Sequence, residues 1–361
     1  MASAKLLSQP EDYQRLGINP DRIEVWEDAR RNISPDTNNF EWWYFDAILD
    51  DGLTAVIQWF TKTGRNILEK GDHPYISVKI TAPDGTFYRK DYKFDKKDTF
   101  YGTDHCDLRF GPHSVKGDLK NYHIHMETID GIGADLTLES LSTPYRPGTS
   151  YIKFDSEVEF FTWLCVVPKG RVTGTLTYGG KTHQVTGFGY HDHQWFSVNF
   201  QKKFNHWVWA RQSFEDYTVL VFDMVTSRDS GYSRFPIMFI EDTDGNTVFE
   251  NTKDVVCSVL EDYHDEVSDK DCPKAIHYVF ENEGKKVEYT LTSQKVIEAN
   301  GKNNIPLAAR LVLKTLGMDI SYTRYLANGE MKFTAGDEVV ERSGELIYEF
   351  MYPGETYKGH M

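Results

Sequence analysis

Apolar and polar residues alternate at every second position through most of the chain. In residues 40–49, FEWWYFDAIL, bulky side chains occupy both faces of the predicted strand, so we expect both faces to be covered. An Asp-Asp-Gly turn leads from it to an apolar strand over residues 54–63, which predicts a first hairpin. A Pro-Asp-Gly turn joins the strands predicted over residues 75–82 and 86–94 in the same way.

The same period predicts strands through the rest of the chain, with hairpin turns between many of them. They cover residues 121–129, 133–141, 156–168, 170–180, 181–193, 206–214, 215–225, 234–242, 243–250, 275–296, 320–339 and 344–352. Helical periodicity is confined to residues 10–17 and 305–317. The sequence therefore predicts an all-β protein made of antiparallel hairpins.

So many strands exceed what one small barrel uses, which predicts two β-barrels or sandwiches in tandem. The polar segment NFQKKFN, residues 199–205, separates two aromatic strands, so we expect domains over residues 1–198 and 199–361. Aromatic strand openings recur in the two halves, as NNFEWWYFDAILDDGLTAVI and FNHWVWARQSFEDYTVLVFD. Each leads through a turn to an apolar strand, which favours duplicated halves.

Composition narrows the class of protein. Hydrophobic residues make up 40% and aromatic residues 14% of the chain, enough for a folded core. The net charge of −15 argues against nucleic acid partners, because such a surface repels phosphate. No stretch approaches the roughly 20 apolar residues of a membrane span, and the first residues lack the apolar core of a signal peptide. We expect a cytoplasmic protein without membrane insertion, whose four separated cysteines are thiols.

Polar residues cluster in residues 187–196, GFGYHDHQWF. On a strand, His191 and His193 project to one face and Asp192 to the other. A His-x-His pair on one face is a common metal-binding arrangement, but ligation needs a third group. The sequence does not show whether His206 or a carboxylate supplies it. Hydrogen bonding at a crowded strand end is the structural alternative, and we expect no metal.

Acid–base chemistry needs only a titratable group in an apolar pocket, where burial raises the pKa of a carboxyl. Four acids stand among aromatic or aliphatic neighbours: Asp46, Asp192, Asp223 and Glu41. The structural alternative for each is a hydrogen bond to the backbone or to an arginine. Glu41 shares its face with Trp43 and Phe45, so it becomes a rival proton donor if that face lines a cavity. A salt bridge is expected if it does not.

Aromatic residues gather in the same segments as these polar residues. They are Trp42, Trp43, Tyr44, Tyr190, Trp195, Trp207, Trp209 and Tyr217. Aromatic strands usually pack in a core, but a cavity lined by them stabilises a developing cation or holds a polyene. Glycine-rich nucleotide motifs, the HExxH zinc motif and the GxSxG nucleophile motif are all absent from the sequence.

Three segments resemble one known family. FEWWYFDAILDDG, GFGYHDHQWF and NHWVWARQSFEDYTVLVFD are similar to motifs of the carotenoid 1,2-hydratase and AttH-like proteins, over about residues 38–225. The resemblance implies two lipocalin-like antiparallel β-barrels in tandem and a cavity for a hydrophobic small molecule. Its known members include hydratases of isoprenoid double bonds, a hydratase of a prenylated isoflavonoid and, more distantly, fungal cyclases that catalyse Diels–Alder reactions.

The resemblance also implies roles for single residues and the absence of a cofactor. His193-Gln194-Trp195 matches the His-x-Trp pair of the carotenoid hydratases, whereas Tyr217 and Asp223 depart from their Tyr-x-Asp spacing. The candidate catalytic residues are Asp192, His193, Asp223 and Glu41. The candidate substrate-binding residues are Trp43, Tyr190, Trp195, His206, Trp209 and Tyr217.

Three functions remain open at this stage. The leading hypothesis is a hydratase in which Asp192 or Asp223 protonates a prenyl double bond and His193 deprotonates the attacking water. Trp43, Trp195 and Trp209 would then stabilise the tertiary cation. The first alternative is a cyclase or isomerase of a polyketide or terpenoid, in which the shape of the pocket dominates. The second is a lipocalin-like carrier without chemistry.

Overall fold

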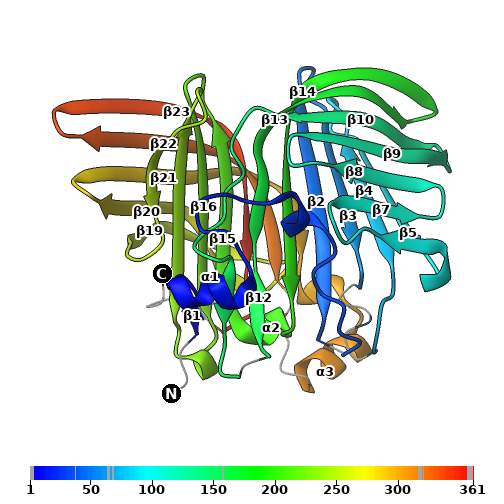
Figure 1. Ribbon diagram of the computed structural model, residues 1–361, viewed down its shortest axis with the longest axis horizontal. Coiled ribbons are helices and arrows are strands. Elements are labelled where there is room, and N and C mark those ends of the chain that lie inside the picture. Colours follow the sequence, from blue (N-terminus) through cyan, green and yellow to red (C-terminus); the bar gives the residue numbers. More distant parts are fainter. Residues whose placement is uncertain are drawn as a thin grey trace. The chain divides into compact units, whose positions relative to one another are not determined.

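The computed structural model describes residues 4–36, 38–62, 66, 69–156, 158–315, 319, 321–355 and 361. The chain divides into two compact units. The first unit is Leu6–Val198, and the second is Asn199–Met361 together with the first residues of the chain. Each unit is built on its own antiparallel sheet, as Figure 1 shows.

The first sheet contains the fourteen strands described in the N-terminal half. Its strands are β1 (Lys5–Leu6), β2 (Phe40–Leu49), β3 (Thr54–Phe60), β4 (Tyr75–Thr81), β5 (Phe87–Lys93), β6 (Thr99–Tyr101), β7 (Cys106–Phe110), β8 (His113–Gly117), β9 (Asn121–Ile129), β10 (Ile132–Ser140), β11 (Tyr151–Lys153), β12 (Phe160–Thr162), β13 (Leu164–Tyr178) and β14 (Lys181–Phe196). The helical segments before and between them are α1 (Pro10–Leu16), η1 (Val25–Asp28) and η3 (Lys96–Asp98).

Strand order places the sequence motifs in the middle of this sheet. The order is β5-β4-β3-β2-β14-β13-β10-β9-β8-β7-β6. One run of neighbouring strands extends from β5 to β2 and the other from β6 to β14, and the two runs meet where β2 pairs with β14. The pairing of β2 with β14 runs from Gly187 opposite Leu49 to Phe196 opposite Phe40. The FEWWYFDAIL and GFGYHDHQWF segments are therefore direct neighbours, although about 140 residues separate them in the sequence.

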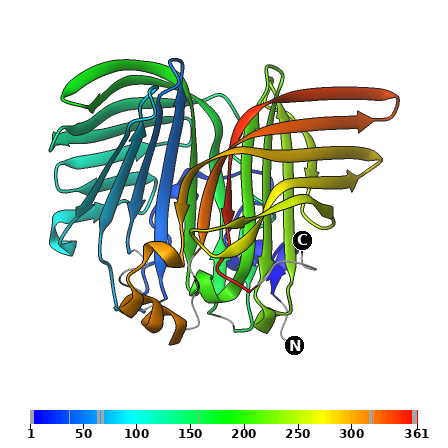
Figure 2. The same ribbon diagram turned by 180° about the vertical axis from the view of Figure 1, so that it is seen from behind.

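The second sheet repeats this organisation. Its strands are β15 (Phe204–Ser213), β16 (Tyr217–Thr226), β17 (Arg234–Asp242), β18 (Thr247–Asn251), β19 (Val256–Asp265), β20 (Lys270–Asn282), β21 (Lys285–Asn300), β22 (Tyr322–Ala335) and β23 (Glu338–Met351). The order β18-β17-β16-β15-β23-β22-β21-β20-β19 pairs β15 with the last strand, as β2 pairs with β14 in the first sheet. The long strands β20 to β23, yellow to red in Figure 2, connect the edge strand β19 to β15 in the middle of the sheet. The short helical segments of this unit are α2 (Phe200–Lys203), η4 (Arg228–Ser230), η5 (Lys302–Asn304) and α3 (Leu307–Thr315).

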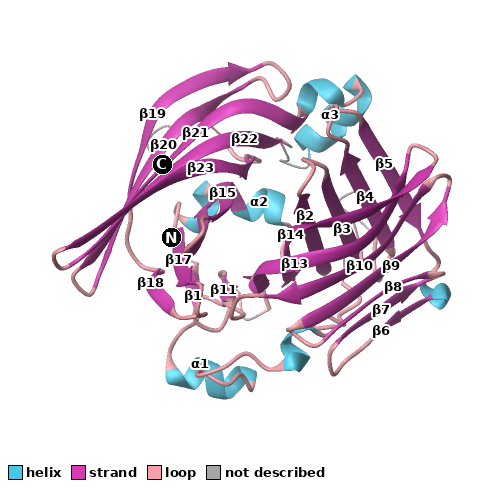
Figure 3. Ribbon diagram, turned by 90° about the horizontal axis from the view of Figure 1, so that it is seen from above, coloured by secondary structure: helices cyan, strands magenta, loops and turns pink. Residues whose placement is uncertain are grey.

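Each sheet curls around its own apolar core (Figure 3). The first core is built on every second residue of the strands, for example Trp43, Phe45 and Ala47 of β2 with Ile57 and Trp59 of β3. The second core includes Val208, Val221, Tyr278, Tyr289 and Tyr348. The fold class predicted from the sequence, all-β with two lipocalin-like antiparallel β-barrels in tandem, is confirmed by these two curled antiparallel sheets. No helix within the described residues is long and apolar enough to cross a membrane.

Several elements differ from the expectation. The strand expected over residues 156–168 is interrupted at Trp163, between β12 and β13. The strands β7, β8 and β19 were not expected, because two are very short and the third is an edge strand with the acidic run Glu261-Asp262. The polar segment at residues 199–205 contains α2, whose N-terminus is capped by the side chain of Asn199.

Candidate functional site

The GFGYHDHQWF segment forms the last ten residues of β14, which are pressed closely against β2. A Cβ atom on Gly189 would lie 2.6 Å from the carbonyl oxygen of Asp46, so only glycine fits there. The alternation of β14 then turns His191, His193 and Trp195 to the core and Tyr190, Asp192 and Gln194 to the opposite face. The single motif therefore contributes to two separate clusters.

On the core face, the two histidines stack on aromatic residues of β2. His193 lies opposite Trp43, and their rings are 4.4 Å apart and nearly parallel. His191 lies opposite Phe45 with its ring 4.0 Å away. Both histidines are 0% exposed, and Trp195 continues the row with its ring 4.8 Å from that of His193.

Glu41 also lies on the core face and is fully hydrogen-bonded. Its Oε1 accepts from the backbone N–H of Arg31 at 2.6 Å and pairs with His193 Nε2 at 2.9 Å. Its Oε2 accepts from the backbone N–H of Asn32 at 2.9 Å and forms an ion pair with Arg30, whose Nε lies 2.8 Å away. Glu41 thus faces the interior and forms there the salt bridge stated as its structural alternative.

Asp28, at the end of η1, completes this network. Its Oδ2 lies 3.1 Å from His191 Nε2 and accepts from the Tyr122 hydroxyl at 2.6 Å, and its Oδ1 lies 3.3 Å from His193 Nδ1. Burial would raise the pKa of Asp28, but the two histidines outweigh it and hold the pKa well below its usual range. The pKa of His193 is raised. Burial alone would lower it, but the contacts of His193 with Asp28 and Glu41 outweigh the effect of burial. The interior network (Asp28, Arg30, Glu41, Asp72, His191 and His193) is therefore a set of interlocked ion pairs.

On the opposite face of β14, Asp192 is held by two aromatic donors. Its Oδ2 accepts from Trp163 Nε1 at 3.0 Å and from the Tyr190 hydroxyl at 2.9 Å. Burial raises the pKa of Asp192 to about 6, although these hydrogen bonds act in the other direction. The interruption of the strand at Trp163 thus has a chemical consequence, because it brings an indole N–H to the carboxyl group.

The second oxygen of Asp192 is less well satisfied. Among the described residues, the hydrogen bond of Oδ1 is with Gln194 Nε2, at a long 3.5 Å. The Gln194 Oε1 atom is buried and has no hydrogen-bond partner in the described part of the chain. We call Tyr44, Asp46, Trp163, Tyr190, Asp192 and Gln194 the outer-face cluster. It therefore presents two neighbouring acceptors with spare capacity inside an aromatic environment.

The structure does not bring all the candidate residues together. Asp192 and His193 are neighbours in sequence, but they lie on opposite faces of β14, so one substrate atom in one cavity cannot contact both. Glu41, Trp43 and Trp195 are on the side of His193. Tyr190 is on the side of Asp192.

In the second unit, Asp223 forms a buried pair with an arginine. Arg234 donates from Nε to Oδ1 at 2.8 Å and from a terminal nitrogen to Oδ2 at 2.6 Å. Burial would lower the pKa of Arg234, but Asp223 outweighs it and raises that pKa. This two-point pairing with a guanidinium is the structural alternative stated for the buried acids.

The remaining candidates in the second unit are dispersed. Tyr217 and Asp223 are six residues apart on β16, which corresponds to about 20 Å along a strand. His206 donates from Nδ1 to Asn205 Oδ1 at 2.7 Å and packs against Phe350. Trp209 lies opposite Phe222 on the face of β15 that turns away from the core.

Breaking the Asp223–Arg234 pair is expected to affect folding. Asp223→Asn leaves the Arg234 charge without its partner, so the free energy of unfolding should fall by about 3 kcal/mol. Urea unfolding followed by circular dichroism measures this change. The matched control is Asp216→Asn, which breaks an exposed pair with Arg342 and should cost less than about 1 kcal/mol. Equal effects of the two variants would contradict the structural role of Asp223.

The interior of the first unit is packed by side chains. A cavity lined by Phe45, Ala47, Ile57, Leu136 and Val172, among others, has a volume of about 20 Å³, enough for a single water molecule. A lipocalin-like carrier holds its ligand inside such a barrel. That cavity offers no room for a polyene.

Several residues of these clusters carried no signal in the sequence. Segments without strand periodicity contain Asp28, Arg30 and Asp72. The sequence around Trp163 is that of an ordinary apolar core strand. One group within the described residues has ligand atoms close enough together to hold a metal ion, namely Asp28, Cys106 and His191. Neither Asp28 nor Cys106 was a candidate in the sequence.

Comparison with known proteins identifies the family to which the chain belongs. The model of the family described as Diels-Alderase-like matches residues 31–295. The chain belongs to the Diels-Alderase-like family. The resemblance stated from the motifs pointed to this group of relatives, and it is confirmed. No curated protein sequence matches the chain.

Solved structures show the same fold at low sequence identity. CghA with Sch210972 has a TM-score of 0.63 at 14% identity, over 93% of this chain and 97% of CghA. A putative AttH from Nitrosomonas europaea has a TM-score of 0.61 at 15% identity, over 92% and 98% of the two chains. Kievitone hydratase from Nectria haematococca has a TM-score of 0.55 at 11% identity, over 99% and 98%. Members of the Diels-Alderase-like family thus share this fold with a hydratase.

Proposed function

We propose that the protein is an enzyme that cyclises a linear, hydrophobic polyene by an intramolecular Diels–Alder reaction. The observation that carries the proposal is the pair of acceptors in the outer-face cluster, Asp192 Oδ1 and Gln194 Oε1, surrounded by aromatic side chains. Membership of the Diels-Alderase-like family supports the reaction type. The substrate would carry a hydroxyl or amide N–H group at its polar end.

The roles of the residues follow from this geometry. Asp192 and Gln194 accept hydrogen bonds from the polar end of the substrate and fix its position. Trp163 and Tyr190 hold the Asp192 carboxyl group in place through Oδ2 and leave Oδ1 to the substrate. The reaction forms two carbon–carbon bonds and moves no proton. Catalysis therefore consists of holding the diene and the alkene in a near-attack conformation.

Hydration of a prenyl double bond is the second candidate function. The fold likeness to kievitone hydratase favours it, and a buried carboxyl group such as Asp192 is a suitable proton donor. It also needs a base that activates water on the same side of the strand. His193 does not supply it, because it is bound between Asp28 and Glu41 on the core face. The separation of Asp192 from His193 removes the acid–base pair proposed from the sequence, and the family match supports cyclisation.

Product stereochemistry tests the cyclisation. A linear polyene with a tethered diene and activated alkene, and with an amide at its polar end, is incubated with and without the protein. Loss of diene absorbance and chromatography of the products give the rate and the ratio of diastereomers. We expect a single diastereomer to be enriched over the mixture formed in buffer. An unchanged rate and ratio for every polyene of a panel with varied tethers would contradict the proposal.

A further inference from the structure

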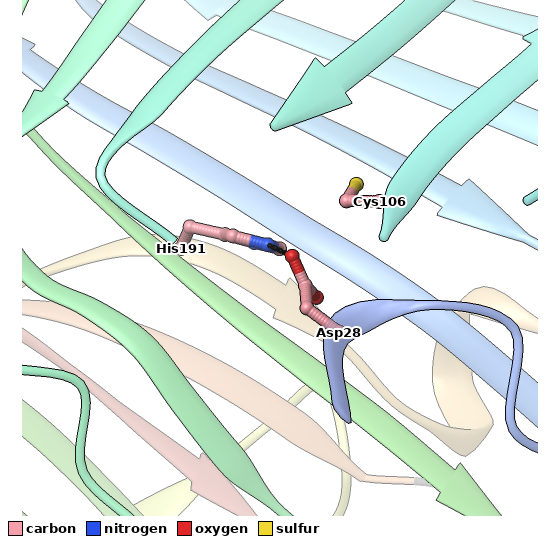
Figure 4. A group of neighbouring side chains, drawn as sticks. All are labelled: Asp28, Cys106 and His191. Atoms are coloured by element: carbon pink, nitrogen blue, oxygen red, sulfur yellow. Dashed lines mark hydrogen bonds and ion pairs between the residues drawn. The ribbon is translucent and has the colours of Figure 1, made fainter. Parts of the chain in front are cut away.

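The part of the interior network around Asp28 has no role in the proposed reaction. Asp28, Cys106 and His191 come from η1, β7 and β14, three segments far apart in the sequence (Figure 4). Their exposed fractions are 0%, 1% and 0%. One potential ligand atom from each residue lies within 4.8 Å of the other two. Tetrahedral Zn²⁺ with bonds of about 2.0–2.3 Å sets its ligand atoms roughly 3.3–3.8 Å apart, so small side-chain movements suffice.

The surroundings orient these groups as those of a metal site do. His191 donates from Nδ1 to the carbonyl oxygen of Tyr44 at 3.0 Å, which directs Nε2 toward Asp28. Ligating histidines are usually fixed in this way by a carbonyl or carboxylate on the other ring nitrogen. The Tyr122 hydroxyl donates to Asp28 Oδ2, and Phe45 covers one face of the imidazole. A polar centre is thus enclosed in an aromatic shell.

The carboxylate also has unused capacity. Asp28 Oδ1 is buried and has no hydrogen-bond partner among the described residues, although His193 Nδ1 lies 3.3 Å away. Oδ1 forms an ion pair with His193 but accepts no hydrogen bond among the described residues, so it keeps a lone pair for a metal ion. A metal ion held by Asp28, with Cys106 as thiolate and His191 as neutral imidazole, would use this oxygen.

We propose that Asp28, Cys106 and His191 supply three of the ligands of a buried site for a borderline-soft divalent cation of the Zn²⁺ class. The mixture of carboxylate, thiolate and imidazole suits this class better than the hard cations Mg²⁺ and Ca²⁺, which prefer oxygen ligands. Binding replaces the thiol proton of Cys106 by the metal bond. The ion ties η1 and β7 to the central strand β14, and its role is independent of the proposed cyclisation.

Cobalt tests the site, because Co²⁺ substitutes for Zn²⁺ and a thiolate ligand gives a sulfur-to-cobalt charge-transfer band. The full chain is produced in medium supplemented with Co²⁺, so that the ion enters during folding, and metal content and absorption are measured on the purified protein. His123→Gln and His125→Gln are included in every sample, since this exposed pair beside Asp135 would bind cobalt without sulfur. We expect about one Co²⁺ per chain and the thiolate band.

Two serine variants decide which thiol is the ligand. Cys106→Ser should remove the band and lower the cobalt content at least tenfold. The matched control Cys165→Ser changes another buried thiol and should keep both. Absence of the band before either substitution, or its survival in Cys106→Ser, would overturn the proposal. The first of these results needs no folded variant, so it stands even if Cys106→Ser fails to fold.

Discussion

Glu41→Gln is expected to lower the free energy of unfolding by about 4 kcal/mol. The substitution keeps the shape of the side chain but removes its charge from between Arg30 and His193. Both Glu41 oxygens accept hydrogen bonds from backbone N–H groups, so the amide nitrogen of glutamine would face such a donor in either orientation. An uncompensated buried charge and a donor–donor contact both destabilise the folded state.

Urea unfolding followed by circular dichroism measures the loss. The matched control is Glu127→Gln on β9, whose side chain is 57% exposed and contacts His125 only at 3.7 Å. That variant should change the free energy by less than about 0.5 kcal/mol. If the two variants unfolded at the same urea concentration, the interior network would not be the stabilising feature that its contacts indicate.

Asp192→Ala is expected to lower kcat/KM for the cyclisation by roughly 10- to 100-fold. The variant removes a charge-assisted hydrogen bond to the substrate, a contribution of about 1.5–3 kcal/mol. It also leaves the Trp163 and Tyr190 donors without their acceptor. Initial rates with the best polyene of the panel measure the effect. Asp135→Asn, an exposed acid on β10, is the control and should retain the full rate.

Asp192→Asn separates the two candidate reactions. Asparagine still offers an acceptor oxygen, so a cyclase that uses Asp192 to position its substrate should lose less than about tenfold. A hydratase that uses Asp192 as proton donor would lose about 100-fold or more with either substitution. Equal and severe losses in the alanine and asparagine variants would contradict a positioning role.

Much of the fold could be predicted from local pattern. The strand at residues 40–49 and the strand at residues 121–129 have the bounds expected from alternation, because each is flanked by turn residues. β19 was not predicted, since an edge strand exposed on one side carries acidic residues at positions where alternation expects apolar ones. The strand order could not be predicted from local pattern either, because the pairing of β2 with β14 joins segments about 140 residues apart.

The candidate site was predictable only in part. Alternation correctly separates His191 and His193 from Asp192, but it does not say which face turns to the core, and here both faces are buried. The partners that determine their chemistry come from elsewhere. Asp28 lies in a 3₁₀ helix and Trp163 at a strand break, and neither position has a periodic signal. Long-range ion pairs and hydrogen bonds of this kind require the fold.

Product mass in H₂¹⁸O tests the central claim most directly. The purified protein is incubated with linear polyenes and, in parallel, with prenylated phenols and acyclic isoprenoids, and the products are analysed by mass spectrometry. The account predicts conversion of a polyene to a cyclised isomer of unchanged mass that contains no ¹⁸O. A product heavier by one labelled water molecule, formed from a prenylated substrate while the polyenes remain unconverted, would contradict it and establish a hydratase.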